Sequence, residues 1–309
     1  MMIVNNKNQL DVVVVGNVTL DVLCYPVEEV PRYESIDFDD VRVSPGGCGS
    51  NTAIGLAALG VNVGIVTCVG DDDTAGLLSK SWERIGVDMR FVKQIIGENT
   101  GVSVGLIDQA YQPRFIHTSG ANAVITPDMF SPKSYAATGA KYLHIAGYFV
   151  LPGLYDDGLA DVLAEARDLG IHTSLDVVTS PRMEDPSPLI PCLQYLDVMM
   201  CNKHEAYRLT ESEEPAKATA ILREMGAHSV IVKLGEKGCW VDSEQFCGQV
   251  PAPVVPVVDT TGAGDAFAAG LLAAKVRGAE LKTACQQGNL AGARVVQQLG
   301  AVEAWFLTD

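Results

Sequence analysis

Short runs of Val and Ile alternate along this chain with segments that have the length and spacing of helices. Residues 11–15 form the first apolar run, residues 51–59 are rich in Ala and Leu, and residues 61–69 return to a strand pattern. The order of strand, helix and strand occurs twice more, over residues 142–177 and 198–234. This alternation predicts an α/β fold with a mostly parallel central sheet, flanked by helices on both faces.

Two segments depart from this rhythm, residues 22–43 and 100–119. They are more polar and show a partial two-residue alternation, as in Val102-Ser103-Val104. Such alternation is typical of strands with one exposed face. We therefore predict a small β-sheet lid built from these two pieces, with two long loops as the alternative. Because no repeat or long linker divides the chain, we expect residues 1–309 to form a single domain with this lid.

Composition disfavours several classes of partner. The formal net charge of -16 would repel a phosphate backbone, so we expect no nucleic-acid partner. The longest mostly apolar run, residues 53–70, is divided by Gly60 and Asn62, so no membrane span is expected. The first residues carry no basic segment followed by an apolar core, and the eight cysteines include no C-x-x-C pair. These features predict a cytoplasmic protein.

The strongest chemical signal is the sequence Asp259-Thr-Thr-Gly-Ala-Gly-Asp265, which stands at the start of a helical pattern. Gly262, Ala263 and Gly264 would offer free backbone N–H groups and the positive end of the helix dipole, which suit the charge that develops on a transferring phosphoryl group. Asp265 could there accept a proton from an attacking hydroxyl. The alternative is that Asp265 only caps the helix.

Three further motifs lie elsewhere in the chain: Gly46-Gly47-Cys48-Gly49-Ser50-Asn51, Asn202-Lys203-His204-Glu205, and Lys233-Leu234-Gly235-Glu236-Lys237-Gly238. The first and third are Gly-rich turns where backbone can approach a ligand closely. The second follows the end of a predicted strand, where ligands collect in open α/β sheets. Its amide and carboxylate suit Mg²⁺ held largely through water and phosphate oxygens, although a helix cap would explain them equally well.

The order and spacing of these four motifs resemble the PfkB (ribokinase-like) family of carbohydrate kinases over nearly the whole chain. The resemblance implies a ribokinase-like fold and an ATP-dependent kinase. It implies that Asp265 is the catalytic base and that the backbone of Gly262, Ala263 and Gly264 forms the anion hole. A dehydrogenase and a P-loop enzyme fit poorly, because their glycine motifs are absent from the expected places.

The resemblance also implies ligand contacts for residues outside that turn. Substrate hydroxyls would be bound by Asp21, Gly46, Gly47 and Asn51. The nucleotide would be contacted by Asn202, Lys233, Gly235, Gly238 and Asn289. Glu205 would organise Mg²⁺ through water and phosphate, and Asp259 and Thr261 stand where some members hold a monovalent cation, such as K⁺.

The acceptor predicted from this resemblance is a hydroxyl of a small sugar, such as ribose or fructose. A nucleoside is the alternative, since it presents the same ribose, and it would need an apolar wall for its base. The candidates for that wall are Tyr25, Phe38, Phe115, Tyr148 and Phe149. A non-catalytic ligand-binding protein of the same fold is a third reading. Lid strands that pair between subunits would give a homodimer.

Two departures from the family pattern bear on the site. Cys48 stands where members acting on phosphosugars often carry Lys, which weakens the case for a sugar-phosphate acceptor. Arg114, on the predicted lid, could still meet a phosphate. The frequent D-P-N sequence after a middle strand is replaced by Asp176-Val177-Val178, so the resemblance gives Asp176 no role beyond a structural one.

Overall fold

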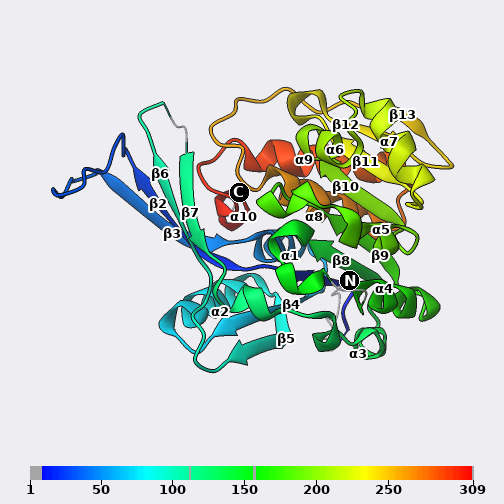
Figure 1. Cartoon of the computed structure of the whole chain (residues 1–309), viewed down its shortest axis with the longest axis horizontal. Helices are drawn as coiled ribbons and strands as arrows, with labels where there is room; N and C mark the ends of the chain where they lie inside the picture. The colour runs from blue at the N-terminus through cyan, green and yellow to red at the C-terminus, as the bar shows by residue number, and fades with distance from the viewer. Residues whose placement is uncertain (1–8, 111–112, 156–157, 308–309) are drawn as a thin grey trace, which may run out of the picture.

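The computed structural model describes residues 9–110, 113–155 and 158–307, and their main feature is a sheet of nine strands (Figure 1). The strand order is β13-β12-β11-β10-β9-β8-β1-β4-β5, and all neighbours from β11 to β5 are parallel. The strands are β1 (Val12–Gly16), β4 (Val63–Gly70), β5 (Asp88–Ile95), β8 (Tyr142–Ala146), β9 (His172–Asp176), β10 (Val198–Asn202), β11 (Val230–Lys233), β12 (Cys239–Asp242) and β13 (Cys247–Val250). The predicted mostly parallel sheet is confirmed, and the antiparallel pairings among these described strands are those of β11 with β12 and of β12 with β13.

Helices cover both faces of this sheet, as the continuous apolar strands require. Val12 and Val14 of β1 pack into one core cluster and Val13 and Val15 into the other, and all four are fully buried. The first cluster includes residues of α1 (Cys48–Ala58), α2 (Asp73–Ile85), α8 (Ala263–Val276), α9 (Leu281–Val295) and α10 (Glu303–Phe306). The second includes residues of α3 (Pro132–Ala137), α4 (Gly158–Asp168), α5 (Ile190–Leu193), α6 (Lys203–Thr210) and α7 (Pro215–Glu224).

A separate sheet of four strands projects from one side of the molecule (Figure 1). Its order is β3-β2-β6-β7, formed by β2 (Thr19–Tyr25), β3 (Asp40–Gly46), β6 (Val102–Ile107) and β7 (Pro113–Thr118). The predicted lid is therefore present, and a parallel pairing of β2 with β6 joins its two pieces of chain. Its strands extend further than expected, because β2 begins at Thr19 and β3 ends at Gly46. The lid thus includes Asp21 and Gly46.

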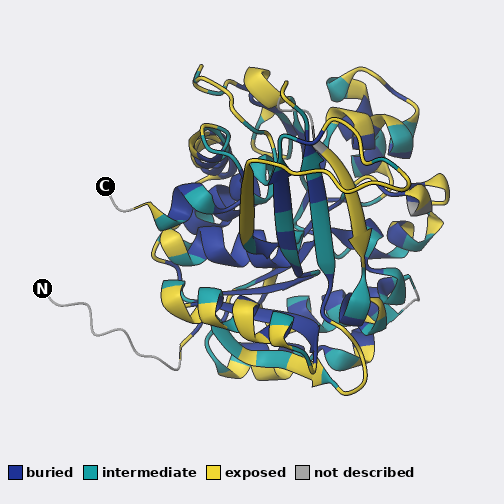
Figure 2. Ribbon diagram, turned by 90° about the vertical axis from the view of Figure 1, so that its left-hand side faces the viewer, coloured by how far each residue is buried: buried dark blue, intermediate teal, exposed yellow. Residues whose placement is uncertain are grey.

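The lid exposes its outer strands to solvent (Figure 2), in contrast to the buried strands of the main sheet. Val41 and Val43 of β3 are 51% and 56% exposed, and Ile116 of β7 is 66% exposed. None of the helices in the described part of the chain has both the length and the apolar character needed to cross a membrane.

A close contact between α1 and α8 brings two distant parts of the chain together. A methyl group on Gly55 of α1 would lie 2.8 Å from the Cβ of Ala269 on α8. Glycine at position 55 therefore lets the two helices approach at this point. Asn51 and Asp265 each stand one turn nearer the N-terminus of their helix, so this contact sets how far apart those two side chains lie.

Gly55→Ala should lower the free energy of unfolding by about 1–3 kcal/mol, although Ala favours a helix, because the new methyl group overpacks the contact with Ala269. Urea denaturation would measure the change. Gly76→Ala in α2 is the matched control, because no atom lies within 4 Å of a methyl group there, and it should raise stability by about 0.5–1 kcal/mol. If Gly55→Ala combined with Ala269→Gly is no more stable than the sum of the two single changes, this explanation is contradicted.

Candidate active site

The N-terminus of α8 forms a turn that exposes backbone N–H groups. Gly262 is the N-cap residue with φ of 73°, and a methyl group there would lie 2.7 Å from the Cβ of Ala301, so both conformation and space require glycine. Ala263 donates its N–H to Thr260 at 3.2 Å. The N–H groups of Gly264 and Asp265 donate to no backbone carbonyl within the described ranges, which leaves them available for an anion. Residues 259–265 are therefore termed the anion-binding turn.

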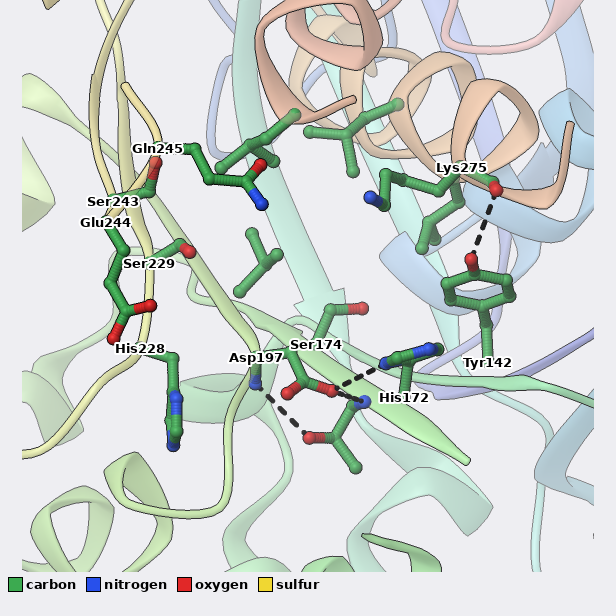
Figure 3. A pocket seen from close by; sticks show the side chains of 15 residues that line it. Tyr142, His172, Ser174, Asp197, His228, Ser229, Ser243, Glu244, Gln245 and Lys275 are labelled. Atoms are coloured by element: carbon green, nitrogen blue, oxygen red, sulfur yellow. Dashed lines mark hydrogen bonds and ion pairs between the residues drawn. The ribbon is translucent and has the colours of Figure 1, made fainter. Parts of the chain in front are cut away.

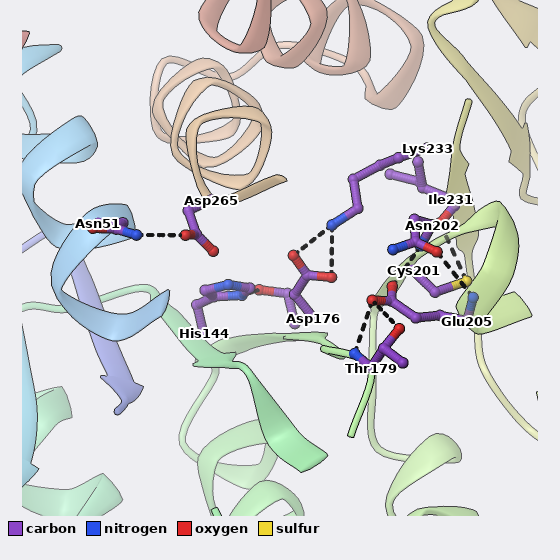
Figure 4. Close-up of polar contacts among 11 residues, drawn as sticks. Asn51, His144, Asp176, Thr179, Cys201, Asn202, Glu205, Ile231, Lys233 and Asp265 are labelled. Atoms are coloured by element: carbon purple, nitrogen blue, oxygen red, sulfur yellow. Dashed lines mark hydrogen bonds and ion pairs between the residues drawn. The ribbon is translucent and has the colours of Figure 1, made fainter. Parts of the chain in front are cut away.

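Asp265 points from this turn toward α1 (Figure 4). Its Oδ2 accepts a hydrogen bond of 2.8 Å from Nδ2 of Asn51. Because Gly262 is the N-cap and α8 has no side-chain cap, the alternative that Asp265 caps the helix is wrong. Burial raises the pKa of Asp265 to about 7, although the hydrogen bond from Asn51 opposes this shift. A carboxylate with such a pKa is suited to general-base catalysis at neutral pH.

The predicted substrate residues lie around the junction of the lid with α1. Asp21 is 9% exposed, and its Oδ1 accepts a hydrogen bond of 2.6 Å from Thr19. Burial raises the pKa of Asp21 to about 6. A methyl group on Gly46 would lie 2.1 Å from Oδ2 of Asp21, and Gly47, the N-cap of α1, has φ of 83°. Gly46 therefore makes room for the Asp21 carboxylate, and Gly47 lets the chain turn into α1 close to residues 17 and 18. Asp21 and Asn51 supply the polar side chains of this region.

Asn51 has one polar atom that its neighbours leave unsatisfied. Its Oδ1 is buried and accepts no hydrogen bond from the described residues, whereas its Nδ2 donates to Asp265. A buried acceptor without a donor is costly, because it has lost its hydration. A ligand hydroxyl beside Asp265 would satisfy it.

Asn202 and Glu205 form a capping box at the start of α6. Glu205 Oε2 accepts a hydrogen bond of 2.7 Å from the backbone N–H of Asn202, and its Oε1 accepts from the N–H of Thr179 at 3.1 Å. Glu205 is 4% exposed, and burial raises the pKa of its carboxyl. Both carboxylate oxygens are thus engaged by backbone donors. Since the described residues hold no cluster of three His, Cys, Asp or Glu side chains that could bind a metal, Mg²⁺ would fit here only through water and phosphate oxygens.

Lys233 and Asp176 form a buried ion pair at the carboxyl ends of β11 and β9 (Figure 4). Lys233 Nζ donates to both carboxylate oxygens of Asp176, at 2.8 and 2.6 Å. A methyl group on Gly264 would lie 3.0 Å from that Nζ and 4.0 Å from Oδ2 of Asp176. The pair therefore lies beside the anion-binding turn. This position of Asp176 was not predicted from the sequence. Its position at the end of a parallel strand was the available signal.

Two of the residues predicted to border the nucleotide, Gly235 and Gly238, occupy the turn after β11, and a third, Asn289, lies on α9. Gly235 and Gly238 have φ of 60° and 87°, and a methyl group on Gly238 would lie 2.1 Å from the carbonyl oxygen of Val250. Asn289 of α9 donates its Nδ2 to the carbonyls of Val250 and Pro251 at 3.1 and 3.2 Å. Its amide thus anchors the start of the loop that leads to the anion-binding turn, and its predicted contact with the adenine side remains a prediction.

Asp259 and Thr261 brace the anion-binding turn at the start of α8. Asp259 Oδ1 accepts from the N–H and hydroxyl of Thr261 at 2.9 and 2.7 Å, and its Oδ2 accepts from the N–H of Gly300 at 2.9 Å. The predicted monovalent cation at these residues remains a prediction.

Arg114 of the lid also makes a bracing contact, because its guanidinium donates to the carbonyls of Val27 and Glu28 at 2.7 and 2.6 Å.

Two cavities lie in different parts of the molecule, one beside the lid and one at the amino ends of strands of the main sheet. One, of about 830 Å³, is lined by the lid residues Tyr25, Asp40 and Arg42 and by Asp259 and Thr260 of the anion-binding turn. The other, of about 260 Å³ (Figure 3), is lined by residues at the amino ends of β8, β9 and β10. Asp176 and Lys233 stand at the opposite, carboxyl edge. Of the predicted site residues, Asp259 lines the 830 Å³ cavity.

Residues 9–306 match the pfkB family of carbohydrate kinases. The chain belongs to this family. Among its relatives, the fructoselysine 6-kinase of Shigella flexneri is 31% identical, covering 83% of this chain and 91% of that protein. The ribokinase of Arabidopsis thaliana is 29% identical, covering 96% and 80%. The structure of Arabidopsis thaliana ribokinase complexed with ribose and ATP superposes with a TM-score of 0.82 at 26% identity, over 96% of this chain and 95% of that one.

For this pfkB family member, Asp265→Asn should lower kcat by at least about 10²-fold and leave nucleotide affinity unchanged, because the amide cannot accept the proton. The unaltered protein should lose kcat/KM about tenfold per unit as pH falls below about 7, where Asp265 becomes protonated. Asp176 raises this pKa, whereas Lys233 and the Cys48 thiol lower it. Steady-state rates from pH 5 to 9 would test this. Turnover near normal in the variant would exclude Asp265 as the base.

Proposed function

We propose that this protein transfers the γ-phosphate of ATP to a hydroxyl of a small sugar. The observation that carries the proposal is the position of Asp265, beside the free N–H groups of the α8 turn and in contact with Asn51. The substrate oxygen would attack the γ-phosphorus and pass its proton to Asp265, while the bond from that phosphorus to the departing ADP oxygen breaks. The N–H groups of Gly264 and Asp265 would meet the charge that develops.

Mg²⁺, when bound with ATP, would neutralise part of the phosphate charge. Asn202 and Glu205 would hold it through water rather than directly, since both Glu205 oxygens accept backbone hydrogen bonds. The relatives support the nucleotide assignment, because Arabidopsis thaliana ribokinase is complexed with ribose and ATP. K⁺, when bound, would lie at Asp259 and Thr261, beside the turn that these two side chains brace.

A neutral sugar is favoured by the side chains around the acceptor position. Asp21 and the unpartnered Oδ1 of Asn51 can each accept a hydrogen bond from a hydroxyl. Cys48 provides no positive charge for a sugar phosphate. Arg114 already donates to two carbonyls within the lid, so it is poorly placed to bind one.

A nucleoside remains the second candidate because Tyr25 borders the 830 Å³ cavity under the lid, where a base could stack. The other aromatic candidates support it less well. Tyr148 and Phe149 are fully buried and pack against each other in the core, with ring centroids 5.0 Å apart. Phe38 and Phe115 of the lid are 42% and 41% exposed.

The proposed function is tested by measuring ADP release with ATP, Mg²⁺ and a panel of pentoses, hexoses and nucleosides. We expect ADP release that depends on a free sugar and that Asp265→Asn reduces at least about 10²-fold. Turnover with nucleosides alone would favour the second candidate. Binding of a sugar without ADP release for any acceptor would instead support a non-catalytic ligand-binding protein and overturn the kinase proposal.

We also propose that two copies of this chain associate through their lids. The register of the lid sheet places mainly apolar side chains on one face, together with Arg114 and Thr118 at its edge. The apolar ones are Leu20, Val22, Cys24, Val41, Val43, Val102, Val104, Leu106 and Ile116. Asp40, Arg42 and Tyr25 belong to the other face, which borders the 830 Å³ cavity. An exposed apolar sheet face of this kind is typical of a protein interface.

Val43→Asp should convert a dimer to a monomer, because it places an unpaired charge in the centre of the proposed contact. Light scattering after size-exclusion chromatography would give the mass of each form. Leu77→Asp in α2 is the control, since Leu77 is also exposed, at 46%, but lies outside the lid. A monomeric unaltered protein, or a Val43→Asp variant that remains dimeric, would contradict the proposal.

A further inference from the structure

The ammonium group of Lys233 is held beside the anion-binding turn with part of its donor capacity free. An ammonium has three N–H donors, and the two hydrogen bonds found for Lys233 within the described ranges both go to Asp176. The side chains of Lys233 and Asp176 are only 14% and 5% exposed. The remaining N–H is therefore available to a ligand in an environment with little water.

This ammonium stays charged despite its burial. Burial by itself lowers the pKa of Lys233, but the carboxylates of Asp176 and Glu205 more than offset that effect, so the pKa is raised. A charged group is costly to bury unless its partners compensate, and breaking such a pair leaves the other charge unpaired. Lys233 thus remains a fixed positive charge at the carboxyl edge of the sheet.

The position of Gly264 relates this charge to the transferred group. A methyl group on Gly264 would lie 3.0 Å from Lys233 Nζ, and Gly264 also supplies one of the two free N–H groups of the turn. An anionic oxygen bound at that N–H would therefore lie close to the ammonium. Because Asp265 adjoins Gly264 in the same turn, a phosphoryl group that receives an oxygen deprotonated by Asp265 would lie next to this space.

We propose that Lys233 is a second catalytic residue, which contacts the γ-phosphoryl oxygens of ATP and stabilises their charge in the transition state, while Asp176 holds its ammonium in position. This inference rests on the proposed function. As the acceptor oxygen bonds to phosphorus and the bond to ADP breaks, the charge on the equatorial oxygens lies between the turn's N–H groups and Lys233. A purely structural ion pair between β9 and β11 is the competing explanation.

The catalytic and the structural explanation predict different results when the charges of Lys233 and Asp176 are both removed. Lys233→Met alone removes the cation and leaves Asp176 without its partner, so it should lower both the melting temperature and the rate. The double variant, Asp176→Asn with Lys233→Met, has no unpaired charge and should recover much of the melting temperature. If Lys233 is catalytic, the double variant should still have a kcat about 10²–10³-fold below the unaltered protein. Recovery of kcat to within a few-fold would overturn the proposal.

Binding gives a readout that does not need turnover. Calorimetric titration with Mg²⁺ and either ATP or ADP measures the preference for the γ-phosphate. We expect the unaltered protein and Asp265→Asn to favour ATP, and Lys233→Met to lose that preference by about tenfold or more, as for a lost contact to a charged group. Equal preferences in the unaltered protein and Lys233→Met would overturn the proposal. If the unaltered protein phosphorylates no acceptor, the proposed function fails, but this titration still decides whether Lys233 contacts the γ-phosphate.

A second ion pair provides the matched control. Arg223 of α7 and Asp242 of β12 lie 2.8 Å apart, and their side chains are 30% and 13% exposed. Asp242 pairs with Val230, at the amino end of β11, whereas Lys233 ends that strand. Arg223→Met should therefore lower the melting temperature without changing kcat or the preference for ATP. A comparable loss of that preference in this control would show that instability alone causes it, and would overturn the assignment of Lys233.

Discussion

The site depends on the close packing of α1 against α8. Asn51 and Asp265 are separated by 214 positions in the chain, yet they share a hydrogen bond of 2.8 Å. This contact exists because Gly55, one turn further along α1, has no side chain to keep Ala269 of α8 away. Both helices begin at the carboxyl edge of the sheet, so a single tight contact orients the proposed base Asp265, the amide of Asn51 and the N–H groups of the α8 turn.

An acidic protein can bind an anionic nucleotide because the local field at this edge differs from the overall charge. The chain has a formal net charge of -16. At the α8 turn, however, two free backbone N–H groups and the ammonium of Lys233 are held in fixed positions, beside the carboxylates of Asp265 and Asp176. Fixed donors in a partly dehydrated position interact more strongly than the many exposed carboxylates, whose effect solvent and salt reduce. Net charge therefore argues against an extended nucleic-acid surface without bearing on a small phosphate site.

Hydrophobic periodicity was sufficient to predict the main sheet and the lid, because burial on both faces or on one face imposes different patterns. The sequence did not reveal that Asp21 and Gly46 belong to the lid strands, since strand ends depend on pairing with distant partners. It also gave Asp176 no role. The partner of Asp176, Lys233, comes from a strand that is not its direct neighbour, because β10 lies between β9 and β11.

The position of Asp21 on β2 makes the lid more than a cover. Asp21 lies on a lid strand, whereas Asp265 and Asn51 belong to helices packed on the main sheet. A displacement of the lid would therefore move Asp21, the proposed substrate contact, relative to Asp265, the proposed base. In the proposed kinase, an acceptor held by both carboxylates would thus also fix the lid against the main sheet.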